Sequence, residues 1–365
     1  MSRMLFQLLR NQLEIKMIVA KVKIGDKLVG EGEPVFIVAE VGSNHDQKLE
    51  QAKQLIDVAA GAGVDAVKFQ TFVADKIVAK IGQKAKYMEK VSEESMYEIF
   101  KRIELPREWH SELAEYANKK GLIFLSSPFD KEAVDLLDAL GVPAFKVASG
   151  ELTNFSLLKY MAKKKKPIIL STGAATMKEV AEAISVIKSA KNEKIILLHC
   201  VMNYPVADED ANLLAINAMK RRFKVPVGYS DHTLGVTAPV VAAALGAAVI
   251  EKHFTLSREL SGPDHFYAIE PGELKTMVNS VRMVGKLLGL PVKQPVKSER
   301  EILKLARRSI FAKVGIPAGA TITGEMLAVL RPAIGLEPKY LEKVIGKQAK
   351  VNIKQYEPIT WDKIQ

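Results

Sequence analysis

Charged and polar side chains recur two positions apart in two short apolar runs, as Lys68 with Gln70 and as Glu251 with His253. In an extended strand residues i and i+2 share a face, so the members of each pair would point to the same side of a sheet. Lys146 lies in a third apolar run. Because a lysine is costly to bury without a counter-charge, Lys68 and Lys146 predict a phosphate or carboxylate held between them. A salt bridge from Lys68 to Glu40 or Glu251 is the structural alternative.

Two histidines end consecutive apolar runs, His232 in VGYSDHT and His253 in EKHF. On neighbouring strands these imidazoles would lie close together. Two imidazoles, completed by water and substrate oxygens, form an open coordination sphere suited to Mn2+, with Mg2+ or Co2+ as alternatives. A hydrogen-bonded scaffold role is the other interpretation of the pair. His199 stands in the apolar segment LLHC and is predicted to be a satisfied core histidine.

Eight short aliphatic runs alternate with segments of helical periodicity, which predicts a parallel sheet covered on its outside. Eight such units in roughly 250 residues favour a closed (β/α)8 TIM barrel within the α/β class over an open sheet. The strands are expected at 35–41, 64–70, 122–128, 144–150, 167–173, 195–201, 226–231 and 248–254, and clear helices at 47–62, 131–140, 177–189 and 272–288.

Every predicted strand ends in polar residues, and in a parallel barrel all these ends open at one mouth. One polar strand end is commonplace, but eight facing the same mouth indicate a site. The serines among them would supply hydroxyl donors to an anion, together with backbone N–H groups at helix starts. These polar residues are Glu40, Lys68, Gln70, Ser126, Ser127, Lys146, Ser149, Glu151, Ser171, Thr172, His199, Ser230, Asp231, His232, Glu251 and His253.

Composition places the chain among globular proteins. Its 365 residues are 48% hydrophobic and 26% charged, and no stretch of eighteen or more apolar residues is present. We therefore expect no membrane segment and a cytoplasmic location, with which the single Cys200 agrees. The net charge of +11 suits an anionic substrate. Nucleic acid is not expected as a partner because the lysines are spread out and carry no nucleic-acid-binding motif.

Four segments follow from the pattern along the chain. Residues 1–34 form an N-terminal extension, peripheral over its first sixteen residues with Met17 as a candidate start, and then a hairpin around Gly25 and Asp26 that would plug the barrel. Residues 35–290 form the barrel. The Pro- and charge-rich stretch 291–306 is a linker, and 307–365 is a small second domain of short strands and turns.

At these residues the sequence resembles the sialic acid synthase family, which includes N-acetylneuraminate synthase and its legionaminic and pseudaminic acid relatives. The C-terminal block resembles the antifreeze-like (SAF) domain of that family. The similarity spans nearly the whole chain from Val35 through AEVGSNH, AGVDAVKFQTF, SSPFD, FKVASGELTN, ILSTG, HCVMNYP, VGYSDHT, EKHFTL, GPDH and ARRSIF to the RP-x-x-G loop at Arg331.

The resemblance implies that phosphoenolpyruvate and an N-acylated amino sugar, first of all N-acetylmannosamine, condense to a nine-carbon sugar acid and phosphate. It implies His232 and His253 as metal ligands and Glu40 as the acid/base carboxylate. It also implies a homodimer in which the SAF domain of one subunit inserts Arg331 into the active site of its partner. The implied phosphoenolpyruvate contacts are Lys68, Lys146, Ser149, Ser171, Tyr204 and Ser230, and the implied sugar contacts are Gln70, Glu151, Asp264 and Arg331. Ser127 is a further predicted substrate contact.

One position departs from the family pattern. The family commonly has a polar residue where this chain has Met202, so either Asn203 replaces that phosphate contact from the next position or the contact is lost. Gly150 in ASGE favours the sialic and legionaminic branch over the pseudaminic branch, and legionaminic and pseudaminic acid synthases stay open as alternatives.

Three other classes compete with this interpretation. A phosphoenolpyruvate aldol synthase of the aromatic pathway shares the barrel, but the C-terminal block disfavours it. A metal-dependent barrel hydrolase would more often place an H-x-H pair on one strand, and the sequence has none. A carbohydrate or ice binder would leave the inner-strand lysines and histidines without a purpose.

Overall fold

The computed structural model describes residues 20–81 and 93–365. The chain divides into two compact units, Met1–Gly289 and Leu290–Gln365, and each is considered by itself. The peripheral extension predicted for the first sixteen residues, with its candidate start at Met17, lies outside the described residues. No helix in the described ranges is long and apolar enough to cross a membrane.

The first unit is built on eight parallel strands, as the apolar runs predicted. Their order in the sheet is β5-β4-β3-β10-β9-β8-β7-β6, and the end strands β5 and β6 also lie side by side, so the sheet curls into a near-closed barrel. The strands are β3 (Phe36–Gly42), β4 (Ala66–Thr71), β5 (Ile123–Pro128), β6 (Phe145–Val147), β7 (Ile168–Ser171), β8 (Ile195–Cys200), β9 (Val227–Asp231) and β10 (Val249–His253).

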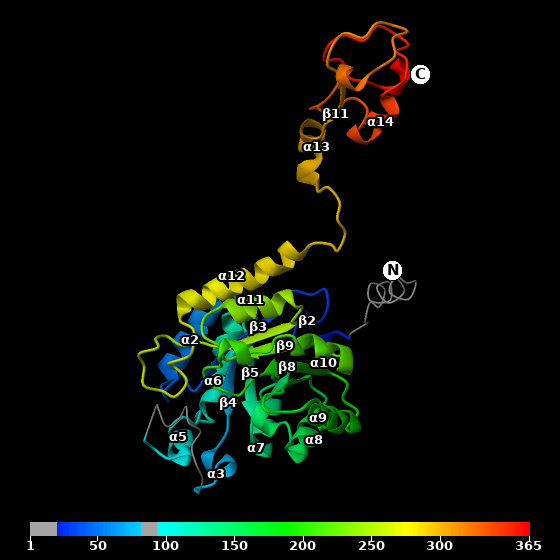
Figure 1. The fold of residues 1–365 in the computed structure, drawn as a ribbon. Coiled ribbons are helices and arrows are strands. Elements are labelled where there is room, and N and C mark those ends of the chain that lie inside the picture. The colour runs from blue at the N-terminus through cyan, green and yellow to red at the C-terminus, as the bar shows by residue number, and fades with distance from the viewer. Residues whose placement is uncertain (1–19, 82–92) are drawn as a thin grey trace. The chain divides into compact units, whose positions relative to one another are not determined.

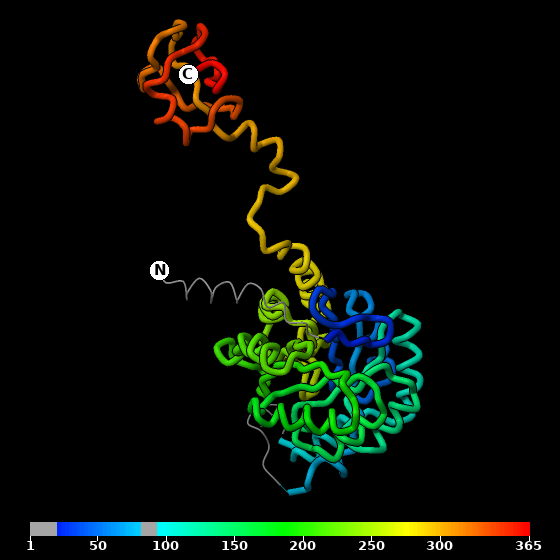
Figure 2. Tube along the Cα trace, turned by 90° about the vertical axis from the view of Figure 1, so that its right-hand side faces the viewer, coloured from blue at the N-terminus to red at the C-terminus, as the bar shows by residue number. Residues whose placement is uncertain are grey.

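Helices surround this barrel, as Figures 1 and 2 show from two directions. Local signals explain where several of them begin: α9 starts with a capping box between Thr176 and Glu179, and the Asp130 side chain caps α7. The α-helices are α2 (Leu49–Ala62), α3 (Ala74–Ile77), α5 (Met96–Arg102), α6 (Trp109–Lys119), α7 (Lys131–Ala139), α8 (Phe155–Lys163), α9 (Met177–Ser189), α10 (Ala215–Phe223), α11 (Thr237–Ala244) and α12 (Pro271–Leu288), with short 3-10 turns at Ser149–Glu151 and Asp208–Asp210.

The predicted hairpin plugs the barrel at the end opposite the polar strand ends. Strands β1 (Val22–Ile24) and β2 (Lys27–Val29) pair antiparallel around Gly25 and Asp26. The buried side chains of Val22, Ile24 and Val29 pack in one apolar cluster with inward-facing strand residues such as Val249. A second and larger cluster fills the space between the strands and the outer helices. Two apolar clusters, one inside the barrel and one between the strands and the helices, therefore hold the strands whose ends form the polar mouth.

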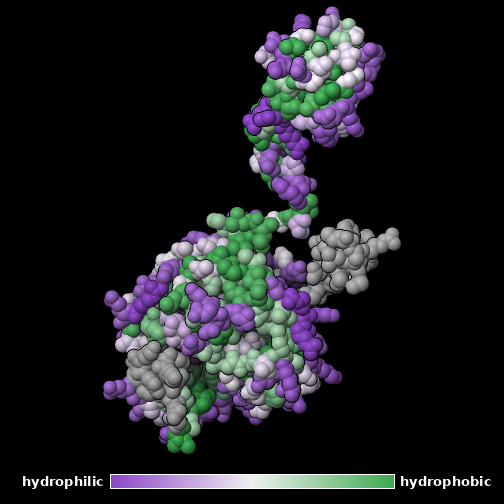
Figure 3. All heavy atoms as spheres, in the orientation of Figure 1, coloured by the Kyte–Doolittle hydropathy of each residue, from purple (hydrophilic) through white to green (hydrophobic). Residues whose placement is uncertain are grey.

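Helix α12 carries apolar side chains on its exposed face as well as on the face that packs against the core. Its buried side chains include Met277, Val278 and Val281, whereas Met283 and Leu287 lie 54% and 76% exposed. Figure 3 shows hydrophobic surface gathered over this helix. The last turns before the boundary between the two units are consequently less polar on their outside than an ordinary surface helix.

The second unit is a small fold with its own core. Strands β11 (Ser309–Ala312) and β12 (Leu327–Leu330) pair antiparallel, and α14 (Leu341–Val344) follows. Helix α13 (Arg300–Ala306) lies in the stretch that composition predicted to be linker. Turns of 3-10 type occupy Lys297–Glu299, Gly324–Met326, Pro338–Tyr340 and Trp361–Lys363, and the core consists of Ile310, Ala312, Ile316, Ile322, Leu327, Leu336, Val344, Ala349, Ile353, Ile359 and Ile364.

Candidate active site

A cavity of about 310 Å³ opens at the carboxyl ends of the strands. Each of the eight strands, or the turn that follows it, contributes to its lining, as the pattern of polar strand ends predicted. The predicted site residues that line it are Glu40, Lys68, Gln70, Ser127, Lys146, Ser149, Glu151, Ser171, Tyr204, Ser230, His232, Glu251, His253 and Asp264.

Two predicted substrate contacts, Asn203 and Arg331, do not line this cavity. Three of the predicted polar strand ends also do not line it, because their side chains bond to other buried groups: Ser126, Thr172 and Asp231. Asn203 is exposed, and the cavity wall at that position is formed by Met202 and Tyr204. The structure therefore offers no support for Asn203 as a replacement phosphate contact. Arg331 is exposed in the second unit, at the end of β12. Its predicted role concerns a partner subunit.

Four buried charged groups form the floor of the cavity. The Nζ atom of Lys68 lies 2.7 Å from Oε2 of Glu40 and 3.7 Å from Oε2 of Glu251, and Nζ of Lys146 lies 3.1 Å from Oε1 of Glu251. The salt bridge considered as the alternative for Lys68 is thus present. Two carboxyl groups balance the two ammonium groups when both are ionised, and protonation of Glu40 leaves the floor with a net positive charge. A further anion near both ammonium groups would then meet favourable charge.

Burial and neighbouring charges give the two carboxyl groups of the floor different pKa values. Burial alone raises the pKa of Glu251, but Lys146 and Lys68 outweigh it and hold that pKa at about 2. Burial raises the pKa of Glu40 to about 7, against the attraction of Lys68. Glu251 is thus a permanent counter-ion, whereas Glu40 can exchange a proton near neutral pH.

Serine hydroxyl groups surround the two lysines. The buried Oγ of Ser171 has no hydrogen-bond partner among the described residues. Ser230 donates to Oε1 of Glu251 over 2.9 Å, and Oγ of Ser149 accepts from the backbone N–H of Gly173 over 2.9 Å. Buried polar atoms are normally satisfied, so the orphaned Ser171 hydroxyl indicates a missing acceptor such as an anion oxygen.

The two histidines predicted as a pair lie together, with ring centroids 5.4 Å apart. Nδ1 of His232 lies 2.9 Å from the carbonyl oxygen of Val201, so it carries the proton and leaves Nε2 free to bind a cation. Burial lowers the pKa of His253 to about 4, which keeps that imidazole neutral as a metal ligand must be.

This donor set fits a divalent cation held by two imidazoles and otherwise by water or substrate. No group of three or more His, Cys, Asp or Glu side chains arranged to hold a metal occurs in the described part of the chain. His199, one strand away, bonds to the carbonyl oxygen of Ala211 and stacks on Tyr229. It is the satisfied core histidine that the sequence predicted.

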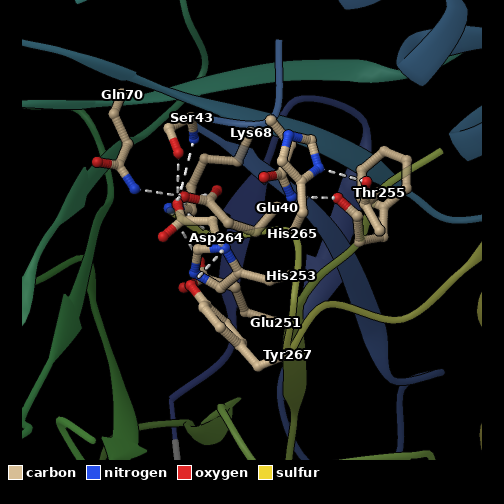
Figure 4. A network of polar contacts seen from close by, with 12 residues as sticks. Glu40, Ser43, Lys68, Gln70, Glu251, His253, Thr255, Asp264, His265 and Tyr267 are labelled. Atoms are coloured by element: carbon tan, nitrogen blue, oxygen red, sulfur yellow. Dashed lines mark hydrogen bonds and ion pairs between the residues drawn. The ribbon is translucent and has the colours of Figure 1, made fainter. Parts of the chain in front are cut away.

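A network that the sequence did not predict ties the loop carrying Asp264 to the end of β3 (Figure 4). Oδ2 of Asp264 accepts hydrogen bonds from the backbone N–H and the hydroxyl of Ser43, at 3.3 and 3.0 Å, and lies 3.8 Å from Nδ1 of His253. Gly42 permits this approach: its φ is +54°, and a Cβ there would meet Asp264 at 2.7 Å. His265 extends the network by bonding Asp46 and Thr255.

The fold and the site define a TIM-barrel enzyme whose mouth combines two buried lysines with a pair of imidazoles. Comparison of the sequence with known families identifies the family of this enzyme. Residues 55–293 match the model of the NeuB family and residues 307–365 match the SAF domain, so the chain belongs to the NeuB family. The predicted relationship to sialic acid synthases and the predicted SAF domain are confirmed.

Named relatives share most of their length with this chain. An N,N'-diacetyllegionaminic acid synthase from Legionella pneumophila is 41% identical, over 93% of this chain and 98% of the relative. A pseudaminic acid synthase from Campylobacter jejuni is 38% identical, over 88% and 94%. The solved N-acetylneuraminic acid synthetase from Leptospira borgpetersenii, in complex with citrate, is 35% identical with a TM-score of 0.71, over 78% of this chain and 95% of that one. The products named for these relatives differ, although all are synthases.

Proposed function

We propose that the protein condenses phosphoenolpyruvate with the open-chain aldehyde of an N-acylated amino sugar, giving a nine-carbon sugar acid and inorganic phosphate. N-acetylmannosamine is the first acceptor to test, and the amino sugars that lead to legionaminic or pseudaminic acid are the alternatives. The observation that carries this proposal is the pair of buried lysines that share Glu251 beside the orphaned Ser171 hydroxyl. The relationship to synthases of this kind supports it.

Phosphoenolpyruvate suits the floor because it carries a phosphate and a carboxylate whose mutual repulsion two ammonium groups would offset. Lys68 and Lys146 are already fixed in place by the glutamates, so little reorganisation is needed when the anion enters. Serine hydroxyls would complete the contacts to the phosphate oxygens.

The reaction needs one carbon–carbon bond and one water molecule. C3 of phosphoenolpyruvate bonds to the aldehyde carbon, water adds at C2, and the C2–O bond to phosphate breaks, so the oxygen of water becomes the C2 carbonyl oxygen. The two protons of that water end on the aldehyde oxygen and on the released phosphate. Glu40, whose pKa lies near 7, would accept the proton of that water, and Gln70 fixes the carboxylate by donating to Oε1 over 2.9 Å. A divalent cation held by His232 and His253 would supply Lewis-acid polarisation of the aldehyde oxygen.

The direct test combines the purified full-length protein, phosphoenolpyruvate, Mn2+ and a panel of amino sugars, with released phosphate as the readout. Phosphate release that requires both an acceptor and phosphoenolpyruvate is expected for at least one sugar. Calorimetric binding of the sugars without any phosphate release would instead indicate a carbohydrate-binding protein. Phosphate release that is independent of every acceptor would indicate a phosphatase.

Lys146→Met is expected to weaken phosphoenolpyruvate binding roughly 10- to 100-fold, because a charge-assisted contact in a buried site is lost. Glu251 keeps Lys68 as its partner, so the barrel should remain folded. Isothermal titration with phosphoenolpyruvate measures the effect. Lys178→Met, which changes a lysine that is 87% exposed, is the matched control and should bind normally. Equal affinity in the two variants would remove Lys146 from the anion site.

Arg331→Ala is expected to raise the apparent KM for the amino sugar more than that for phosphoenolpyruvate. This follows from the second part of the proposal, a homodimer in which each SAF domain completes the partner's site with Arg331. Steady-state kinetics with each substrate varied in turn measure the two effects. The opposite order of the two changes would refute the role of Arg331, and a monomer in analytical ultracentrifugation would refute the shared site.

A further inference from the structure

A buried ion pair that the proposed reaction does not use joins β9 to β10. Nζ of Lys252 lies 2.5 Å from Oδ2 of Asp231, and the two side chains are 2% and 0% exposed. The two residues are directly opposite each other in the parallel register. Tyr229 and Ile250, two residues earlier on each strand, pack in the cluster between the strands and the helices. The pair shares this outer face of the barrel, and we call it the outer ion pair.

Stability alone gives little reason for a charged pair at this place. Removing two charges from water is costly, and the attraction between them often does no more than offset that cost. The residues of β9 and β10 that share the outer face, Val227, Tyr229 and Ile250, are hydrophobic and buried. An apolar pair would therefore serve the packing equally well, which indicates a role other than packing.

The outer ion pair lies directly behind the two histidines of the cavity. Asp231 precedes His232 in the chain, and Lys252 precedes His253. Because neighbouring residues of a strand face opposite ways, the histidines line the cavity and the ion pair does not. Lys252 is thus bound through the backbone to one imidazole-bearing residue, and its side chain reaches the segment that carries the other.

The ammonium group of Lys252 holds the chain on both sides of His232. Besides its bond to Asp231, it donates to the carbonyl oxygen of Thr233 over 2.5 Å. Oδ1 of Asp231 in turn accepts from the backbone N–H and the hydroxyl of Thr233, at 2.9 and 2.8 Å. The residues before and after His232 are therefore joined to each other and to the residue before His253.

The backbone ladder does not by itself set the spacing of the two histidines. Pairing between β9 and β10 ends at Asp231 and Lys252, one residue short of both. His253 is still paired with β3, whereas His232 lies beyond the end of its strand. The ring of His232 bonds to the carbonyl oxygen of Val201, which follows β8. The outer ion pair adds the connection from the His232 segment to β10.

We propose that the outer ion pair positions the imidazoles of His232 and His253 for a divalent cation, and that it contributes to metal affinity more than to the stability of the barrel. The inference rests on the metal site of the proposed function. Two imidazoles share one ion well only when their spacing and directions suit it, and the contacts that orient metal ligands are typically worth about 10- to 100-fold in affinity. Lys252 and Asp231 are thus positioning residues.

The double variant Lys252→Met with Asp231→Asn tests the proposal in the full-length protein. It removes both charges without leaving either one unpaired, and the asparagine oxygen can still accept from Thr233. Without metal, its thermal unfolding temperature should stay close to that of the unchanged protein. Isothermal titration should show Mn2+ binding weakened roughly 10- to 100-fold. The Mn2+ concentration that gives half-maximal phosphate release should rise by the same factor, while KM for phosphoenolpyruvate at saturating Mn2+ stays within a few-fold.

An ion pair at the opposite end of the barrel provides the matched control. Arg282 bonds to Asp65, just before β4, and to the carbonyl oxygen of Val35, just before β3. Arg282→Met with Asp65→Asn therefore removes a cation that bridges a carboxylate and a backbone carbonyl, as Lys252 does, but at the strand ends away from the cavity. The Mn2+ affinity of this control should equal that of the unchanged protein, whatever its change in stability.

The single variant Asp231→Asn guards against a double variant that fails to fold. It keeps an acceptor for Thr233 and the bond from Lys252 to the Thr233 carbonyl oxygen, so it should weaken Mn2+ binding by a smaller factor. Normal Mn2+ affinity in the folded variants, with or without a loss of stability, would reject the positioning role and leave the metal site of the proposed function standing. If the unchanged protein bound no Mn2+, the metal site and this inference would be rejected together.

Discussion

Replacing His253 with alanine is expected to lower Mn2+-dependent turnover at least about 1,000-fold, because Lewis-acid assistance contributes several kcal/mol to a transition state in which negative charge develops on oxygen. Phosphoenolpyruvate binding should stay within a few-fold of normal. The lysines and serines of the floor do not depend on this imidazole for their contacts, since Lys146 bonds to Glu251 and Ser149 to Gly173. Phosphate release and isothermal titration measure the two effects separately.

Metal binding can also be followed without catalysis. Mn2+ should raise the thermal unfolding temperature of the unchanged protein by mass action and leave that of His253→Ala almost unaltered. His199→Asn is the matched control, because His199 lies on β8, two strands from β10 in the sheet, and its side chain bonds within the core in the described structure. That variant should unfold at a lower temperature but keep its response to Mn2+. An equal response to Mn2+ in His253→Ala would exclude this histidine as a ligand.

The barrel and most of its mouth could be predicted from the sequence because their signals are local. Near-continuous apolar runs mark the parallel strands, and all eight lie where the runs predicted them. The spacing of Lys68 with Gln70 and of Glu251 with His253 follows from the two-residue period of a strand, and all four line the cavity. Once the barrel closes, chain order also brings the two histidines together.

Contacts between loops that are distant in the chain could not be predicted, because no local pattern in the sequence indicates them. Ser43 bonds to Asp264 across 221 residues, and neither residue type indicates the other. The positive φ of Gly42, which makes that contact possible, becomes interpretable only when its neighbours are known. Two apolar residues that line the cavity, Met96 and Phe100, were missed for a related reason: they look like ordinary helix core until the position of α5 is known.

The two interpretations of Lys68 turned out to be compatible. The sequence left a bound anion and a salt bridge as alternatives, and the structure contains the salt bridges to Glu40 and Glu251. The lysine pair can still receive an added anion when Glu40 is protonated, because Glu251 alone cannot neutralise both ammonium groups. Residue types alone could not indicate this sharing, which depends on where three separate strands place their side chains.

Glu40→Gln is expected to lower kcat about 100- to 10,000-fold, the usual range for loss of a general base. The amide keeps the size of the side chain and its contact with Gln70, so the floor should remain in place. Removing one negative charge should leave phosphoenolpyruvate binding unchanged or stronger. Steady-state phosphate release and calorimetry measure these changes. Glu193→Gln, at a glutamate that is 73% exposed, is the control and should behave as the unchanged protein does.

The pH dependence gives a second readout with a definite sign. Burial raises the pKa of Glu40 to about 7, so below that pH the carboxyl group is protonated and cannot accept the proton of the attacking water. Turnover of the unchanged protein should rise with pH through about 7, and Glu40→Gln should lack this rise.

Stability should move in the opposite direction. A carboxyl pKa raised on folding contributes stability that is fully present below its unfolded value of 4.5 and is lost as pH rises through about 7. The free energy of unfolding, from denaturant titrations at several pH values, should therefore fall over this range more steeply for the unchanged protein than for Glu40→Gln. If the rise in turnover persisted in the variant, another group would be the base. If the two proteins showed the same pH dependence of unfolding while turnover of Glu40→Gln stayed low, Glu40 would act in catalysis but its pKa would not be raised by folding.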